Sequence, residues 1–97
     1  MCKNVKDMGK IDTDSIIKRL KRIEGQVRAI IRMVESDKPC EEILILISAA
    51  KSALHKVGQV VLEGHLRHCV VDGIKNGEEE KTINKLLSAL EQFSRIN

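Results

Sequence analysis

Three residues of this chain have the side chains and the spacing to bind a metal ion: Cys40, His65 and Cys69. His65 and Cys69 are four residues apart, a separation that places two side chains on the same face of a helix. Cys40 precedes His65 by 25 residues, and at about 100° per residue it returns to nearly the same face. Two thiolates and one imidazole form a soft ligand set that suits Cu(I). The sequence therefore predicts a site for a soft metal ion built from these three residues.

One straight helix cannot bring these three ligands together. At a rise of about 1.5 Å per residue, Cys40 lies roughly 37 Å from His65 along the helix axis. A second copy of the chain, running antiparallel, would carry its own Cys40 to His65 and Cys69 of the first copy. Twofold symmetry would then create two equivalent sites. The ligand spacing therefore predicts an antiparallel homodimer.

Other interpretations of the same residues stay open. Zinc also accepts cysteine and histidine but normally takes a fourth ligand, for which His68 and Cys2 are candidates. A buried cysteine often behaves as a small hydrophobic residue, His68 and His55 can be ordinary surface histidines, and Cys2 can be an incidental thiol. Two cysteines and a histidine on one helix face favour metal binding over these structural roles.

The composition is that of a small cytoplasmic protein that needs partner chains. A chain of 97 residues forms one domain and buries only a modest share of its surface alone. Its three cysteines are an odd number, which favours reduced thiols over a disulfide framework. The N-terminus lacks the apolar stretch of a signal peptide. The longest apolar run, Ile43–Ile47, is far shorter than the roughly 20 residues of a membrane span, so no membrane partner is expected.

Apolar periodicity predicts an all-α fold with three helices per chain, in a single domain over residues 12–97. The first helix runs from a start at Asp12–Asp14 to about Ser36, and residues 1–11 are expected to form a flexible tail. The second helix runs from Cys40 to a stop at Asn76-Gly77 and is apolar on nearly all sides, so partner chains must cover it. A third helix opens at Glu78–Glu80 and carries its own apolar stripe: Ile83, Leu86, Leu87, Leu90 and Phe93.

A basic face lies opposite the apolar stripe of the first helix. It consists of Lys18, Arg19, Lys21, Arg22, Arg28 and Arg32. Such a face can simply be solvated, but the shared sign of its charges and the net charge of +3 favour a polyanion such as double-stranded DNA. The sequence contains no catalytic constellation, so an enzyme is not expected, and it lacks the familiar helix-turn-helix, zinc-finger and basic-zipper patterns.

Three blocks of sequence closely resemble the CsoR family of bacterial metal-sensitive transcriptional repressors, within it the copper-sensing type. They are RLKRIEGQVRAIIRMVESDKPC, ISAAKSALHKVG and GHLRHCV, and the resemblance covers about residues 13–95. It implies an antiparallel dimer of helical-bundle type that assembles into a tetramer. It also implies repression by operator DNA binding in the absence of ligand and release from DNA on binding Cu(I).

The resemblance also implies roles for particular residues. Cu(I) is expected between Cys40 of one protomer and His65 and Cys69 of the other, and DNA contacts are expected at Arg19 and Lys56. The charge pattern adds Arg22 to the DNA-binding set. Copper sensors of the family often carry a tyrosine and a glutamate where this chain has Pro39 and Lys85. The residues that transmit metal binding to the DNA-binding face are therefore expected to differ.

Two other functions are compatible with these residues. A repressor that senses persulfides or thiol oxidation could use Cys40 and Cys69 as a reactive pair. A cytosolic copper buffer could use the same ligands without any role in DNA binding.

Overall fold

The computed structural model describes residues 10–95, and nearly all of them are helical. The elements are α1 (Lys10–Glu35), α2 (Cys40–Gly64), the π-helix η2 (His65–Val70), α3 (Val71–Lys75) and α4 (Glu79–Ser94). α2, η2 and α3 follow one another without a break and form a central rod of 36 residues, Cys40–Lys75. The predicted all-α fold with one long central helix is confirmed.

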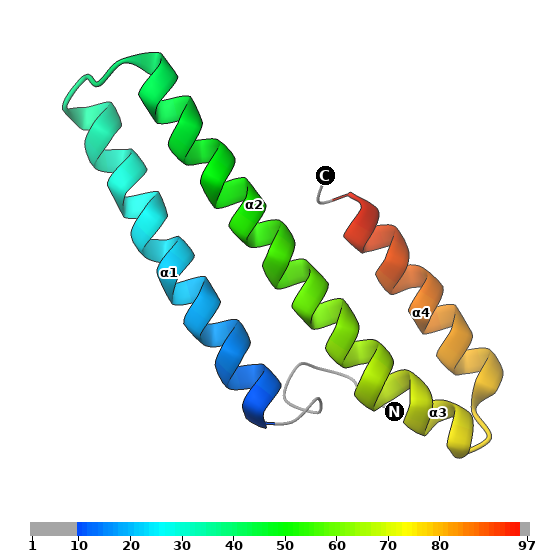
Figure 1. Cartoon of the computed structure of the whole chain (residues 1–97). Coiled ribbons are helices and arrows are strands. Elements are labelled where there is room, and N and C mark those ends of the chain that lie inside the picture. The colour runs from blue at the N-terminus through cyan, green and yellow to red at the C-terminus, as the bar shows by residue number, and fades with distance from the viewer. Residues whose placement is uncertain (1–9, 96–97) are drawn as a thin grey trace.

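The three helical rods form a single layer. α1 runs antiparallel to α2, and α4 folds back along the opposite side of the central rod (Figure 1). The principal extents are 57 × 25 × 14 Å, so the thickness is close to that of one helix with its side chains, about 10–12 Å. Because a stable domain needs at least two packed layers, this layer leaves apolar faces without a covering layer.

The buried core is correspondingly small. It is centred on Ile16 and Ile23 of α1, Val57 of α2 and Cys69 of η2, with Ala53, Val60 and Val61 packed against it. Many large apolar side chains remain exposed, among them Leu44, Ile45, Ile47 and Leu54 on α2, Ile83, Leu87 and Leu90 on α4, and Val27, Ile31 and Val34 on α1.

The turn between α1 and α2 uses a residue in the left-handed conformation. Asp37 has φ 59°, its N–H donates to the Val34 carbonyl at 3.2 Å, and the N–H of Lys38 donates to the Met33 carbonyl at 3.0 Å. This is a Schellman motif, in which glycine normally occupies the left-handed position. Pro39 then precedes the first turn of α2, where its missing N–H costs nothing.

The turn between α3 and α4 is also a Schellman motif, and here glycine occupies the left-handed position. Gly77 has φ 78°, its N–H donates to the Ile74 carbonyl at 3.1 Å, and the N–H of Glu78 donates to the Gly73 carbonyl at 2.9 Å. The predicted stop at Asn76-Gly77 is therefore confirmed.

Gly73 allows α4 to approach the central rod closely. A Cβ at this position would collide with the side-chain oxygen of Thr82 and lie 3.0 Å from its Cγ2. Thr82 is fully buried, so its side chain has little room to move away. Gly73 is therefore required by packing.

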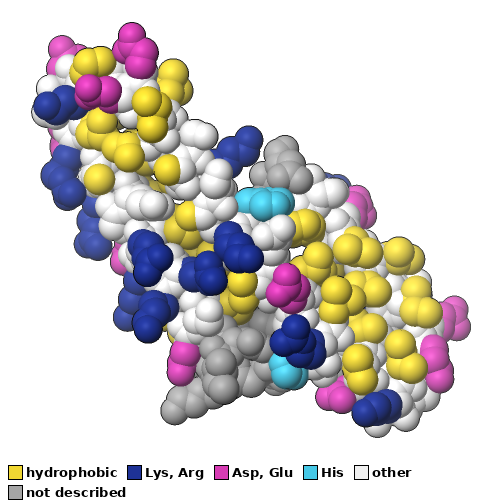
Figure 2. Space-filling model, viewed as in Figure 1, with side chains coloured by type: hydrophobic (Ala, Val, Ile, Leu, Met, Phe, Trp, Pro, Cys, Tyr) yellow, Lys and Arg dark blue, Asp and Glu magenta, His cyan; other side chains and the backbone are white. Residues whose placement is uncertain are grey.

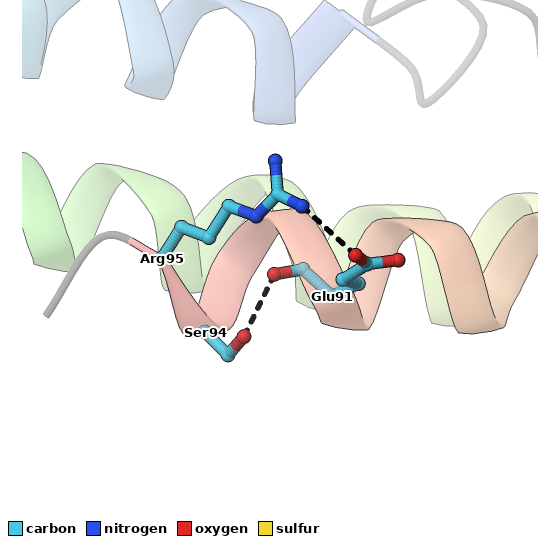
Figure 3. Close-up of polar contacts among 3 residues, drawn as sticks. All are labelled: Glu91, Ser94 and Arg95. Atoms are coloured by element: carbon cyan, nitrogen blue, oxygen red, sulfur yellow. Dashed lines mark hydrogen bonds and ion pairs between the residues drawn. The ribbon is translucent and has the colours of Figure 1, made fainter.

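α4 also packs against the middle of the rod and ends with local polar contacts. The rings of His55 and Phe93 lie 5.1 Å apart at an angle of 33°. In the last turn, the Ser94 hydroxyl donates to the Glu91 carbonyl at 2.7 Å, and the Arg95 guanidinium pairs with the Glu91 carboxylate at 2.9 Å (Figure 3). These exposed contacts add little stability, so apolar packing must hold α4 in place.

The first helix starts earlier than predicted. α1 begins at Lys10, so residues 10 and 11 belong to the helix and the expected start at Asp12–Asp14 is too late. The first N–H groups of any helix lack partners within the helix, so acidic and hydroxyl residues are favourable within the first turn as well as at the cap. A cluster of such residues therefore does not fix the first residue of a helix. The rest of the predicted tail, residues 1–9, lies outside the described residues.

The central rod is long and apolar enough to cross a membrane, judged by length and composition alone. The core helix of a helical assembly has the same properties. Two lysines, Lys51 and Lys56, are exposed in its middle, and charged residues at that depth in a bilayer are costly. The composition of the rod is therefore also that expected of a helix covered by other helices.

Candidate metal centre and nucleic-acid interface

The π-helix η2 holds two of the predicted metal ligands and one alternative ligand. His65 begins it, and His68 and Cys69 lie within it. A π-turn closes hydrogen bonds over five residues instead of four, and such turns often occur at functional sites. The flanking residues keep helical dihedral angles, with φ −63° and ψ −41° at Gly64 and φ −60° and ψ −46° at Val71. The sequence pattern predicts an unbroken α-helix here, and only the buried Gly64 before it hints at a local irregularity.

His65 has the free nitrogen that a metal ligand requires. Its side chain is half-buried, and its Nε2 atom is buried without a hydrogen-bond partner among the described residues. A buried polar atom without a partner is costly, and a metal ion would supply the missing partner. This observation fits His65 to the predicted role.

Cys69 is the most buried of the predicted ligands. Its exposed fraction is 0%, and it packs with Ile16, Ile23 and Val57. Its sulfur is disulfide-bonded in the structure, which differs from the reduced state that the sequence suggests. Because the thiolate is the form that binds metals, Cys69 can act as a ligand only after reduction and only where a partner reaches its side of the rod.

Cys40 lies at the other end of the central rod. It is the first residue of α2, and its thiol is free and exposed. The chain alone therefore does not bring Cys40 to His65 and Cys69. Within residues 10–95 no group of three or more His, Cys, Asp or Glu side chains could hold a metal ion. A site made of Cys40, His65 and Cys69 would therefore need a second chain, as the sequence argument anticipates.

The other candidate ligands differ in their surroundings. His55 stacks on Phe93, so it has a packing role, although its Nδ1 atom is buried without a partner in the described part of the chain. His68 is half-buried within η2. Cys2 lies outside the described residues.

The predicted DNA-binding residues are exposed on α1 and α2. Arg19 and Arg22 lie on α1 and Lys56 lies on α2. Ile16, Ile23 and Val57 share one core cluster, so Arg19 and Lys56 lie at a similar level along the antiparallel pair. Figure 2 shows basic side chains gathered over the α1 side of the molecule, whereas apolar side chains dominate the end formed by α3 and α4.

Comparison with known proteins assigns the family. Residues 12–92 match the family model described as metal-sensitive transcriptional repressor. The chain belongs to this family of metal-sensitive repressors. This confirms the resemblance seen in the three sequence blocks. The family consists of transcriptional repressors, not enzymes.

Named members of the metal-sensitive repressor family are similar to most of this chain. The copper-sensing transcriptional repressor CsoR of Bacillus subtilis is 48% identical over 84 residues, which cover 87% of this chain and 83% of that protein. The copper-sensing repressor RicR of Mycobacterium tuberculosis is 50% identical over 64 residues, 66% of this chain and 67% of the relative.

Solved structures of such repressors have the same fold. The Cu(I)-containing crystal structure of CsoR from Geobacillus thermodenitrificans superimposes with a TM-score of 0.83 at 41% identity, covering 97% of this chain and 94% of that one. The nickel-responsive regulator InrS gives a TM-score of 0.76 at 34% identity, covering 82% and 90%. Metal sensors of different specificity therefore share this architecture.

Proposed function

We propose that this chain is a Cu(I)-responsive transcriptional repressor of the cytoplasm, which binds operator DNA without metal and leaves it when Cu(I) binds. The observation that carries the proposal is the buried Nε2 of His65, which has no hydrogen-bond partner among residues 10–95 and lies in the same π-turn as Cys69. Relatives with copper-sensing names support the choice of metal, as does the soft character of the ligands.

The proposed site is shared between two chains. Cys40 of one protomer joins His65 and Cys69 of an antiparallel partner, because the central rod separates these residues within one chain. The exposed apolar faces of the single layer support a dimer and its assembly into a tetramer. When bound, Cu(I) would link the N-terminal end of one rod to the π-turn of the other.

The DNA-binding set is Arg19, Arg22 and Lys56, which would contact phosphates of the duplex. Phosphate contacts supply affinity that depends strongly on salt and carries little sequence information. A shift of the DNA-competent fraction from about 99% to 1% needs a difference of roughly 5.5 kcal/mol in Cu(I) affinity between the two conformations. Thiolate bonds, which form in only one of them, can provide this difference.

A DNA-release experiment tests this function. Fluorescence anisotropy with the duplex that lies upstream of the encoding gene should show tight binding by the reduced apo protein and release on addition of Cu(I). Cys40→Ala should bind the duplex with unchanged affinity and ignore Cu(I). An upstream duplex bound equally well with and without Cu(I) would contradict the proposal.

The same experiment separates the two alternatives. A persulfide sensor would leave the duplex on treatment with polysulfide in the absence of Cu(I), and interchain-linked Cys40 and Cys69 would appear in non-reducing mass spectrometry. A copper buffer would bind Cu(I) but show no site-specific association with DNA. The first result would favour the persulfide sensor and the second the copper buffer, and either would contradict the proposed function.

A further inference from the structure

Gly25 lies in the middle of α1, where nothing in residues 10–95 requires a glycine. Glycine destabilises a helix interior relative to alanine. Among the described residues, a Cβ at Gly25 would meet nothing within 4 Å, so packing against them does not exclude a side chain. The conformation does not require glycine either, because Gly77 is the glycine with positive φ in the described part of the chain. The surface around Gly25 is therefore open to a partner that approaches α1 from outside.

Basic side chains surround Gly25 on the helix surface. At about 100° per residue, five cations point within roughly 60° of its direction: Lys18, Lys21, Arg22, Arg28 and Arg32. All five are exposed. Arg28 has an ion pair with Glu24, but at 3.9 Å and with both side chains about two-thirds exposed it is weak. We refer to Gly25 and these five cations as the Gly25 surface.

The charge of the Gly25 surface identifies the kind of partner that it fits. From Lys18 to Arg32 it extends roughly 20 Å along the helix, and between these residues the arc contains no acidic residue. A second copy of the same surface would be repelled by like charges. Duplex DNA carries one negative charge per roughly 1.7 Å of its axis, so it offers several phosphates over this length.

We propose that Gly25 is the point of closest approach between α1 and the sugar–phosphate backbone of duplex DNA. The missing side chain lets the helix backbone lie close to the strand, so that the five flanking cations reach phosphates on both sides of it. This inference rests on the proposed DNA-binding function. It shares Arg22 with the proposed DNA-binding set and adds to that set a residue whose role is close approach without charge.

Two substitutions of Gly25 separate close approach from helix stability. Gly25→Ala should raise the thermal unfolding temperature by a few degrees while it weakens DNA binding several-fold. Gly25→Gln is uncharged and helix-compatible, yet it should weaken binding at least tenfold, because its side chain holds the duplex away. Ser88→Gln is the matched control, since Ser88 is exposed on α4 on the side opposite the apolar stripe. It should leave binding unchanged.

Anisotropy with a random-sequence duplex and with the upstream duplex, over a series of salt concentrations, provides the readout. For Gly25→Gln, the slope of log K against log salt should become shallower by about one to two, as expected for the loss of one or two phosphate contacts. Equal affinity and slope in wild type and Gly25→Gln would overturn the inference. So would a change in oligomeric mass on gel filtration with light scattering, which would place Gly25 at a protein–protein contact. Failure of the wild type to bind either duplex would instead refute the proposed function.

Discussion

The two ends of the central rod differ in how deeply they bury the predicted metal ligands. At the Cys40 end, the thiol is free and exposed at the start of a regular α-helix. At the other end, Cys69 is fully buried, His65 has a buried nitrogen without a partner among the described residues, and the backbone makes a π-turn. For the proposed metal site, one chain thus provides one shaped half and one open half. The proposed Cu(I) site therefore requires a pair of chains.

The largest expected effect is the loss of the Cu(I) response on removal of either thiol, with different effects on stability at the two ends. Cys40→Ala and Cys69→Ala should both abolish release from DNA by Cu(I). Cys69→Ala should also lower the free energy of unfolding by about 1 kcal/mol, as for the loss of a buried methyl-sized group. Urea unfolding under reducing conditions measures this difference. Equal stability of the two variants would show that the ends are not distinguished by burial.

The next effect concerns the close contact beyond the π-turn. Gly73→Ala should destabilise the protein by about 1–3 kcal/mol, because its methyl group collides with the buried Thr82. Thr82→Ala in the same chain should recover part of the loss, which a double-mutant cycle measures. Simple additivity of the two substitutions would mean that the collision is relieved elsewhere.

Substitution of His65 should change the Cu(I) response without lowering the stability of the fold. His65→Leu replaces a buried nitrogen that has no hydrogen-bond partner in the described part of the chain. The free energy of unfolding should therefore stay the same or rise by about 1 kcal/mol, while the Cu(I) response is lost. Thermal unfolding and DNA release of the same sample test both parts. A strongly destabilised His65→Leu protein would indicate that the imidazole serves the fold.

The smallest effects lie in the two Schellman turns. Asp37→Gly should stabilise the protein by about 0.5–1 kcal/mol, because φ 59° costs aspartate more than glycine. Gly77→Ala should destabilise it by a similar amount, about 1 kcal/mol, for the converse reason. Denaturation midpoints of the two variants should therefore move in opposite directions. Shifts of the same sign would show that side-chain contacts, and not the value of φ, determine the stability effect of substitutions at these two positions.

Local signals predicted most of the fold. The apolar periodicity gave the three helical rods, and Asn76-Gly77 and the glutamates after it marked a helix end and the next start. The start of α1 at Lys10 differs from the predicted start at Asp12–Asp14, because acidic and hydroxyl residues favour several positions in a first turn and helix boundaries vary by one or two residues.

The predicted site depends on information that a single chain lacks. Spacing alone placed His65 and Cys69 close together and Cys40 far away, and the structure has the same separation along the rod. The π-turn and the complete burial of Cys69 were not predictable, because both depend on packing of the rod against its neighbours. Gly25 was likewise not recognised, since an uncharged residue adds nothing to a charge pattern.

The most direct test of the shared site is complementation between two inactive chains. Cys40→Ala and Cys69→Ala are co-refolded under reducing conditions with different affinity tags, and the mixed dimer is isolated. A site shared across chains predicts that this dimer has one intact set of ligands and binds one Cu(I), whereas each parent dimer binds none tightly. A mixed dimer without tight Cu(I) binding would contradict the account, as would a wild-type protein that binds Cu(I) tightly as a monomer.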